Sequence, residues 1–316
     1  MDDLVVQTEL PPEHRSGFVA LIGRPNVGKS TLLNAYVGQK VAIVSKKPQT
    51  TRNRILGILT RPDAQVVFLD TPGFHEPMHK LGEYMVQAAR QAVADADVAL
   101  FLVDASVPPT PEDRLVADLL ASRCACPVIL VLNKMDLLRA DKVQSYTEGY
   151  LALGRYNPRR SGTEYQDWMM VSAANGHNLD KLLAMMLTQL PLGPRYFPEG
   201  QVTDLTERFV VSELVREQVL RFLLQEVPHA VAVVVEEFQE RRPGLIHIAA
   251  TIFVEKDSQK GIVIGAQGKM LKQIGSAARQ EIERVLNSQV HLELWVKVRP
   301  KWRRDQVSLR HIGYPL

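Results

Sequence analysis

The segment Gly23–Ser30, with the sequence GRPNVGKS, decides how the first half of the chain folds. It follows the apolar run FVALIG (18–23) and opens STLLNAYV (30–37), whose apolar spacing is that of a helix. The pattern G-x-x-x-x-G-K-[ST] between a strand and a helix lets backbone N–H groups close around a phosphate. Lys29 would reach the phosphate oxygens, and the Ser30 hydroxyl can bind magnesium. A glycine turn without a ligand is the alternative, which this strand-loop-helix context disfavours.

Further apolar runs end, like the first, in a polar or glycine residue. They are QVVFLD (65–70), VALFLVD (98–104), VILVLN (128–133) and WMMVSA (168–173), with helix-length amphipathic stretches such as 79–95 and 112–122 between them. This alternation predicts an α/β fold in which helices cover a doubly wound parallel sheet. Ligands of such sheets bind at the carboxyl ends of the strands, where these runs stop.

Two of these strand ends carry further candidate site residues. At DTPG (70–73), Asp70 can hold magnesium through water and the Gly73 N–H can meet a γ-phosphate, although the same letters are also good turn chemistry. At NKMD (133–136), Asp136 can accept hydrogen bonds from both N1–H and the amino group of guanine, which adenine cannot offer. Asn133 can contact the N7/O6 side of the base, and Lys134 can lay its stem along the ring. Ser172 and Ala173 would supply a short side chain and an N–H for O6.

The ordered motifs GRPNVGKS, QTTR (49–52), DTPG, NKMD and VSA (171–173) resemble those of translation-factor-related GTPases, and over residues 18–190 the chain is similar to the Era-like family. The resemblance implies GTP or GDP with Mg²⁺ as ligands, and a loop at QTTR that closes on GTP with Thr51 as a second hydroxyl ligand to magnesium. From its residue types alone, this segment could equally well be a polar, basic surface loop. The predicted nucleotide-binding residues are Gly23, Arg24, Pro25, Asn26, Val27, Gly28, Lys29, Ser30, Thr31, Thr50, Thr51, Asp70, Thr71, Pro72, Gly73, Asn133, Lys134, Asp136, Ser172 and Ala173.

Hydrolysis of GTP needs neutralised phosphate oxygens and an aligned water. The predicted catalytic residues are Lys29, Thr51, Gly73 and Asn26, and the metal ligands are Ser30, Thr51 and Asp70. Phe74 stands where many GTPases have a water-orienting glutamine, so the resemblance implies slow turnover assisted by K⁺ that Asn26 and the Thr50 backbone hold. His75 is a second candidate for positioning water. HEPMH (75–79) fits the zinc-protease pattern, but Pro77 would interrupt the helix that this pattern needs.

After the proline-rich stretch LPLGPRYFPEG (190–200) the order of elements changes. A helix (about 204–226), strands at 230–238 and 245–255, a possible helical turn near 257–263, a helix (about 268–287) and a strand at 290–298 are predicted. Gly265–Gly268 reads G-x-x-G before a helix, where glycines allow a nucleic-acid backbone to approach. The whole resembles a type II KH domain, which implies that single-stranded RNA lies against Ile262, Ile264, Gly265, Ala266, Gln267, Gly268, Lys269 and Lys272, with Ile274 as a further apolar contact.

The charge distribution supports RNA binding by the C-terminal part of the chain, since residues 256–316 hold 12 lysines and arginines against 5 acidic residues. We expect an extension (1–15), a GTPase domain (16–190), a linker (191–202), a KH domain (203–300) and a basic tail (301–316). The acidic N-terminus and the absence of an apolar run of about 18 residues argue against secretion and membrane spanning. Cys124 and Cys126 are expected to be reduced and to have a packing role. The spacing of the histidines does not match that of metal ligands.

The family resemblance also implies partners and a location. The RNA would be the 3′ end of 16S rRNA and the partner the small ribosomal subunit during its assembly, with peripheral membrane attachment as a further feature. The reduced cysteines predict a cytoplasmic protein, and a monomer is expected. A second phosphate-loop motif is absent, which argues against a two-GTPase assembly factor. The remaining alternative is an RNA-binding protein that uses GTP only as a structural ligand.

Overall fold

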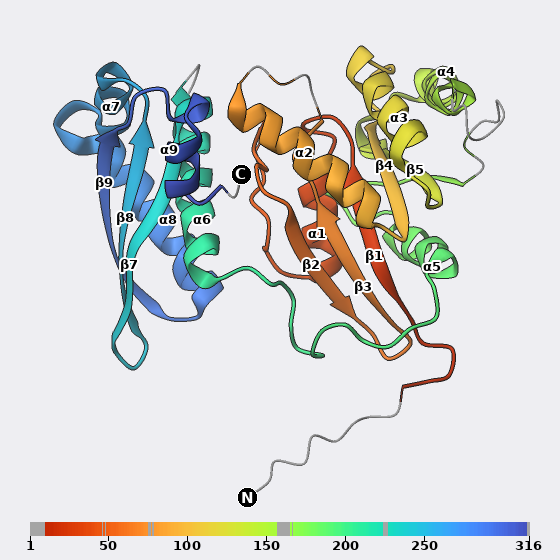
Figure 1. Cartoon of the computed structure of the whole chain (residues 1–316), viewed down its shortest axis with the longest axis horizontal. Helices are drawn as coiled ribbons and strands as arrows, with labels where there is room; N and C mark the ends of the chain where they lie inside the picture. Colours follow the sequence, from red (N-terminus) through yellow and green to blue (C-terminus); the bar gives the residue numbers. More distant parts are fainter. Residues whose placement is uncertain are drawn as a thin grey trace, which may run out of the picture.

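The computed structural model describes residues 10–45, 47, 49–74, 77, 79–156, 165, 167–223 and 227–314. These residues form two domains that lie side by side (Figure 1). The linker between them, which contains neither helix nor strand, passes along the edge strand of the first domain. There Ile58 N donates to Val202 O at 2.8 Å and Thr203 Oγ1 donates to Leu56 O at 2.7 Å. No helix among the described residues is long and apolar enough to cross a membrane.

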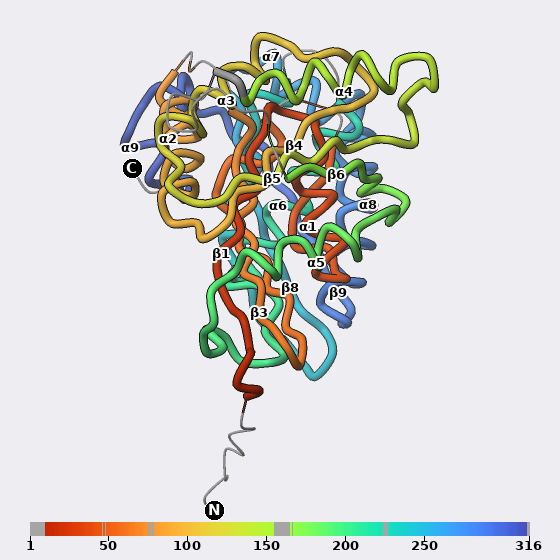
Figure 2. The backbone as a smooth tube through the Cα atoms, turned by 90° about the vertical axis from the view of Figure 1, so that its right-hand side faces the viewer, coloured from red at the N-terminus to blue at the C-terminus, as the bar shows by residue number. Residues whose placement is uncertain are grey.

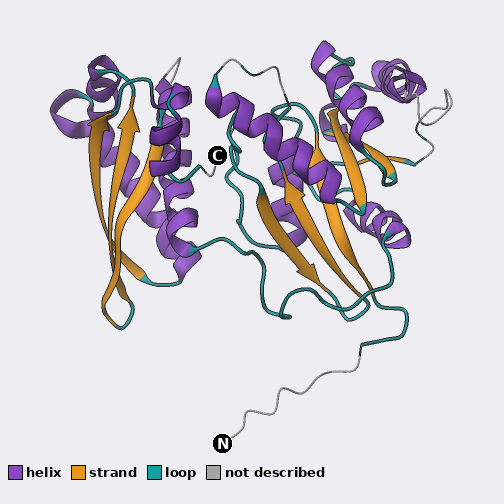
Figure 3. Cartoon of the chain, viewed as in Figure 1, coloured by secondary structure: helices purple, strands orange, loops and turns teal. Residues whose placement is uncertain are grey.

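The first domain is a six-stranded sheet with helices on both faces (Figure 3). Its elements are β1 (Arg15–Ile22), α1 (Lys29–Val37), β2 (Ile55–Thr60), β3 (Ala64–Asp70), α2 (Lys80–Asp95), β4 (Val98–Asp104), α3 (Pro111–Arg123), β5 (Val128–Asn133), η1 (Met135–Leu137), η2 (Ala140–Lys142), α4 (Val143–Leu151), η3 (Ala152–Tyr156), β6 (Trp168–Met170) and α5 (Leu179–Gln189), where η denotes a 3₁₀ helix. Every residue of β3, β4 and β5 is buried, because α1 and α5 cover one face and α2 and α3 the other.

The strand order is β2-β3-β1-β4-β5-β6, and the predicted α/β class is confirmed with one correction. All neighbours are parallel except β2 and β3, so the sheet is mixed. The prediction missed β2 because its apolar run is short and contains Gly57. That glycine is where α1 packs on the strand, since a Cβ there would lie 2.3 Å from Leu33 Cδ1. The parallel strands β1, β3, β4 and β5 still bring their carboxyl ends to one edge, as the site requires.

The two cysteines pack at the edge of this core. Cys124 is buried in it and Cys126 packs against it, and their Sγ atoms lie 2.7 Å apart. Their burial agrees with the packing role expected from the sequence, although their sulfur atoms lie closer together than the C-x-C spacing suggested.

The second domain has the predicted order α-β-β-α-α-β. Its elements are α6 (Glu207–Phe222), η4 (Val227–Ala230), β7 (Ala232–Arg242), β8 (Leu245–Val254), α7 (Asp257–Ile264), η5 (Ala266–Gly268), α8 (Lys269–Leu286) and β9 (Gln289–Val298). The sheet order is β7-β8-β9, antiparallel between the first pair and parallel between the second. Because side chains alternate along a strand, Ile248, Ala250 and Ile252 of β8 face the core beneath α6 and α8.

The C-terminal residues do not form the basic tail expected for 301–316. They fold into η6 (Trp302–Arg304) and α9 (Gln306–His311), and Trp302 is fully buried. Together with Leu309 and Tyr314 it packs on Leu81 and Met85 of α2, so the segment joins the two domains. Figure 2 shows α9 beside α2 from a second direction. Trp302 and Tyr314, which lie in the segment expected to be a basic tail, therefore belong to an interdomain core.

Candidate functional site: nucleotide cavity and RNA groove

The loop between β1 and α1 is shaped to hold an anion. Gly28 has a left-handed backbone (φ 101°), and a Cβ there would lie 2.2 Å from Asn133 Nδ2, so only glycine fits. Lys29 is 5% exposed, and its Nζ donates to the carbonyls of Gly23 and Arg24 at 3.0 Å each. Burial lowers the pKa of Lys29 to about 8, against the opposing pull of Asp70. A bound phosphate would supply the negative charge that favours protonated Lys29.

The predicted magnesium ligands meet at one point. Ser30 Oγ donates to Asp70 Oδ2 at 2.6 Å and lies 2.9 Å from Thr51 Oγ1, which is 3.4 Å from the same carboxylate oxygen. Neighbouring ligands of octahedral Mg²⁺, at about 2.1 Å from the ion, are themselves roughly 3 Å apart. The other oxygen, Asp70 Oδ1, is buried and lacks a hydrogen-bond partner among the described residues, and burial raises the pKa of Asp70 to about 6. The residues therefore fit Mg²⁺, which would also stabilise the ionised carboxylate.

The loop after Asp70 lies directly against the phosphate loop. A Cβ on Gly73 would come within 2.7 Å of Pro25, so the two loops need glycine to approach this closely. Thr71 is fully buried and donates its hydroxyl to Leu21 O at 2.8 Å. This bond holds the loop to β1, and the assignment of Thr71 as a nucleotide contact stays a prediction. Phe74 packs against the core, which agrees with the expectation that it does not orient water.

One asparagine is hydrogen-bonded to two neighbouring segments of the predicted nucleotide site. Asn133 is 2% exposed, its Nδ2 donates to Val27 O at 2.8 Å, and its Oδ1 accepts from Ala173 N at 2.9 Å. The Ala173 N–H thus donates to Asn133 within the protein, and its role as a donor to O6 stays a prediction. Asp136 is exposed in η1, where its carboxylate can meet a base.

Lys134 is held in the orientation that the base site needs. It has a left-handed backbone, and its Nζ donates to Asp104 Oδ2 at 2.6 Å. Burial raises the pKa of Asp104, but hydrogen bonds from Lys134 and Ser106 outweigh it and hold that pKa below its ordinary value. Asp104 was missed by the sequence analysis, although its position at the end of β4 is a signal that could have found it.

A cavity of about 880 Å³ opens between the two domains at the phosphate loop. Of the predicted residues it is lined by Pro25, Asn26, Gly28, Lys29, Ser30, Thr31, Thr50, Thr51, Gly73 and Lys134. The second domain contributes residues that sequence reasoning missed, namely Glu217, Gln218, Leu220 and Arg221 of α6 and Glu281 of α8. Their apolar and charged spacing is that of any surface helix, so no sequence signal marks them. The phosphate site therefore borders the second domain.

The arginine of QTTR makes a buried contact between the domains. Arg52 is 2% exposed, and its guanidinium donates to Val231 O at 2.7 Å and to His229 O at 3.1 Å. It also donates to Tyr314 Oη at 3.4 Å and lies 5.7 Å from the Trp302 ring centroid. Burial lowers the pKa of Arg52. The residue next to a magnesium ligand is thus anchored in the second domain.

Other residues of the same loop repeat this arrangement. Lys40 pairs with Glu217 at 2.6 Å and with Glu281 at 3.3 Å, and the Val44 N–H donates to Glu217 Oε1 at 3.0 Å. Each pair joins residues more than 170 positions apart in the chain. The stretch between α1 and β2 that precedes QTTR is therefore held by α6 and α8.

The groups expected to position water and to bind potassium have different surroundings in the structure. The Thr50 carbonyl, expected to hold K⁺ with Asn26, accepts a hydrogen bond from the Arg216 guanidinium of α6. Asn26 lines the cavity with a left-handed backbone. His75 lies outside the described residues. The zinc-protease reading of 75–79 fails for the described part, because α2 begins only at Lys80 and His79 caps it by accepting from Gly82 N.

The predicted RNA-binding loop has the expected form. Gly265, Gln267 and Gly268 all have positive φ, and α8 begins directly after them. Lys269 and Lys272 are exposed, as are Ala266 and Gln267. A second cavity of about 390 Å³ runs from this loop between α8 and β9, the edge strand, and is lined by Gly268, Leu271, Lys272, Gly275, Ser276, Arg279, Leu292 and Leu294. Arg279 is a lining residue that the sequence analysis did not select.

The apolar contacts expected for RNA bases divide into three kinds. Ile262 is 50% exposed and available to a base, and Ile264 packs partly against the core. Ile274 is fully buried between α8 and the sheet, so the expectation that it contacts RNA is wrong. Its place on the inner face of the amphipathic helix explains the burial.

Two family models match the chain, one described as a 50S ribosome-binding GTPase over residues 18–134 and one as a KH domain over residues 226–303. A structure described as Era in complex with MgGDPNP and nucleotides 1506–1542 of 16S ribosomal RNA is 40% identical, with a TM-score of 0.89, covering 96% of this chain and all of the other. A variant of Era from Aquifex aeolicus bound to GDP·AlF4⁻ is also 40% identical over the same shares, with a TM-score of 0.87. The chain is therefore a member of the Era family of GTPases.

Proposed function

We propose that this GTPase binds single-stranded RNA at the 3′ end of 16S rRNA and that its nucleotide state controls this binding during assembly of the small ribosomal subunit. One observation carries the coupling. The loop that provides Thr51 to the metal site is bonded, through Arg52 and Lys40, to the domain that carries the RNA groove. The 40% identical relative bound to MgGDPNP and a 16S fragment supports the identity of both ligands.

The residues of this chain divide the work of hydrolysis. Bound Mg²⁺, held by Ser30, Thr51 and Asp70, would neutralise charge on the β and γ oxygens. Lys29 and the loop N–H groups at the start of α1 bind the same oxygens from the other side. Phe74, at the position of the water-orienting residue, packs against the core, and we expect slow intrinsic hydrolysis. An RNA or ribosomal partner that orders the loops is therefore expected to accelerate it.

Potassium assistance is part of the proposal, through Asn26 and the Thr50 carbonyl. Because that carbonyl accepts a hydrogen bond from Arg216, potassium and this guanidinium compete for it. The second domain would have to withdraw Arg216 before potassium binds. Comparing hydrolysis in potassium and sodium chloride, with and without RNA, tests this idea, and equal rates in the two salts in both conditions would remove it.

The central experiment measures RNA affinity in defined nucleotide states. A labelled RNA with the 16S 3′-terminal sequence and a shuffled control would be titrated with the full chain loaded with GDPNP or with GDP. We expect preference for the ribosomal sequence and a difference between the two states. Lys29→Ala should lose nucleotide binding and, with it, the difference between states, while keeping RNA affinity. Equal affinity in both states would contradict the coupling.

A second function is an RNA-binding protein in which GTP is only a structural ligand. It would show RNA binding and GTP binding but no cleavage in a single-turnover assay. The cleavage assay is needed because the cluster of Ser30, Thr51 and Asp70 would hold Mg²⁺ beside bound GTP in either case.

We propose the cytoplasm as the place of action and a monomer as the working form. Sedimentation of the full chain and fractionation of cells test these two points. We also propose peripheral membrane attachment, which the buried Trp302 of the C-terminal segment would not provide, because that segment is folded against α2. Vesicle flotation of the full chain would decide it, and recovery in the unbound fraction would dismiss it.

A further inference from the structure

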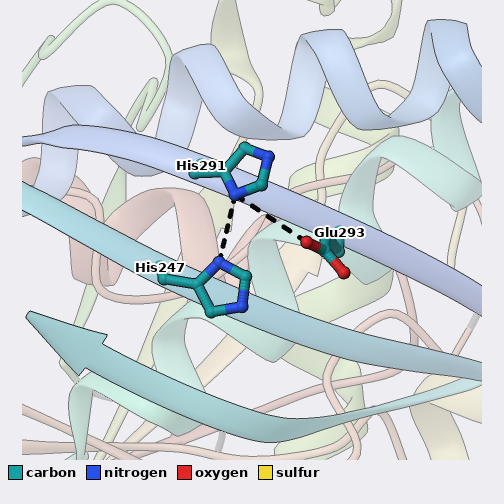
Figure 4. A group of neighbouring side chains, drawn as sticks. All are labelled: His247, His291 and Glu293. Atoms are coloured by element: carbon teal, nitrogen blue, oxygen red, sulfur yellow. Dashed lines mark hydrogen bonds and ion pairs between the residues drawn. The ribbon is translucent and has the colours of Figure 1, made fainter. Parts of the chain in front are cut away.

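Two histidines and a glutamate meet on the sheet of the second domain, away from both sites described above. The parallel register of β8 and β9 places His247 directly opposite His291, and Ala249 opposite Glu293. Because side chains alternate along a strand, these groups share the face opposite the one that α6 and α8 cover. Figure 4 shows the two rings and the carboxylate gathered around His291 Nδ1.

Their spacing suits a small divalent cation. His247 Nδ1 lies 3.1 Å from His291 Nδ1, and Glu293 Oε1 lies 3.8 Å from the same His291 nitrogen. The ligand atoms of the three residues all lie within 4.8 Å of one another. Two ligands of tetrahedral zinc, each about 2.1 Å from the ion, are separated by roughly 3.4 Å, so minor side-chain rotation brings this set to bonding distance.

A fourth residue is placed as an outer partner. Glu237 of β7 has its Oε2 3.7 Å from His247 Nε2, the nitrogen that faces away from His291. Histidine ligands commonly donate their second ring N–H to a carboxylate, which fixes the tautomer that leaves the first nitrogen free to bind metal. Here this arrangement would direct the His247 lone pair at Nδ1 toward the site.

Exposure shows how an ion would enter. The His247 side chain is 4% exposed, whereas those of His291 and Glu293 are 61% and 44% exposed. The cluster thus has one buried ligand on the central strand, β8, and is open to solvent on one side. The open side leaves a coordination position for water. The histidines show no ligand spacing in the sequence, because these two are 44 residues apart and only the strand register brings them together.

We propose that His247, His291 and Glu293 form a zinc-binding site, with Glu237 as a positioning residue. Two nitrogens and one carboxylate oxygen match zinc better than magnesium, which prefers oxygen ligands alone. The site lies near the amino-terminal ends of β8 and β9, while the G-x-x-G loop follows the carboxyl end of β8. Metal binding should therefore tie β9 to β8 without occupying the RNA groove.

The test is a zinc titration of the full chain against a chromophoric chelator, in excess Mg²⁺ and GDP so that the nucleotide site is filled. We expect one zinc per chain, at least a tenfold loss of affinity in His291→Ala and in Glu293→Gln, and no change in the control His311→Ala. The two test residues are exposed, so their variants should keep the metal-free melting temperature of the wild type.

A second readout follows the imidazole nitrogens by NMR, where zinc should shift the signals of His247 and His291 together. Absence of zinc binding by the wild type, or wild-type affinity in His291→Ala, would overturn the proposal. Zinc binding that His291→Ala and His311→Ala weaken equally would also overturn it, because the ion would then bind elsewhere.

Discussion

Replacing Arg52 by alanine should loosen the contact between the two domains while leaving each domain folded. Every hydrogen-bond partner of this guanidinium that the structure describes belongs to the second domain or to the C-terminal segment. The variant would leave the carbonyls of Val231 and His229 without this donor, and it would remove the contact with the Trp302 ring. Arg54→Ala is a matched control, because Arg54 is 40% exposed and pairs with Asp95 of its own domain.

The magnitude follows from these partners. A buried carbonyl left without its donor costs about 1–3 kcal/mol, and a cation–π contact contributes about 0.5–2 kcal/mol. Burying the guanidinium is itself unfavourable, as its lowered pKa indicates, and removing it returns part of this energy. We therefore expect the free energy of domain opening to fall by about 2–4 kcal/mol, a factor of about 30 to 1,000 in the opening equilibrium.

Native-state hydrogen exchange measures this opening directly. In Arg52→Ala, amides of η4 and α9 should exchange faster by that factor, while amides of β3 and β4 in the first sheet should not change. The ratio of RNA affinities in the GDPNP and GDP states should also move toward one. If Arg52→Ala and Arg54→Ala increase exchange equally, the anchoring role given to Arg52 is refuted.

Three further predictions concern the sites themselves. Asp136→Asn should weaken GTP binding about 5- to 150-fold and shift preference toward xanthine nucleotides, measured by competition, because a carboxylate acceptor becomes an amide. Gly268→Asp should weaken RNA binding in a filter assay through negative charge and a left-handed backbone (φ 76°), with hydrolysis unchanged; its Cβ meets no atom within 4 Å, so the domain should stay folded. Asp70→Asn should abolish the magnesium dependence of nucleotide binding in calorimetry, and chelation with EDTA should then no longer weaken binding, whereas it does in the wild type.

The local parts of this structure could be predicted from sequence because their signals are local. β3, β4 and β5 are continuous apolar runs since both faces of the sheet are covered, and the phosphate loop is a contiguous motif. Residue type alone does not tell whether Ile274 is buried or exposed, because its burial depends on which face of α8 meets the sheet. β2 was missed since Gly57 breaks its apolar run, although that glycine is what lets α1 pack on the strand.

The contacts between domains could not be predicted for a different reason. Arg52 and Tyr314 are 262 positions apart, and nothing in the letters QTTR distinguishes a buried arginine from a solvated one. The same holds for His247 and His291, which only the register of β8 and β9 brings together. In both cases the chemistry depends on a distance set by tertiary structure, so sequence spacing carries no signal of it.

This placement makes the coupling between nucleotide and RNA reciprocal. Thr51 belongs to the cluster of predicted metal ligands, and the side chain of Arg52 is buried against the second domain. Because consecutive Cα atoms are about 3.8 Å apart, neither residue can move far without the other. If the GTP state raises RNA affinity by some factor, RNA must raise GTP affinity relative to GDP by the same factor. Measuring GDPNP and GDP affinity with saturating RNA therefore tests the coupling independently of the RNA titration. A factor of one would refute the coupling, and unequal factors would mean that one titration had not reached equilibrium, because a thermodynamic cycle closes whatever the number of conformations.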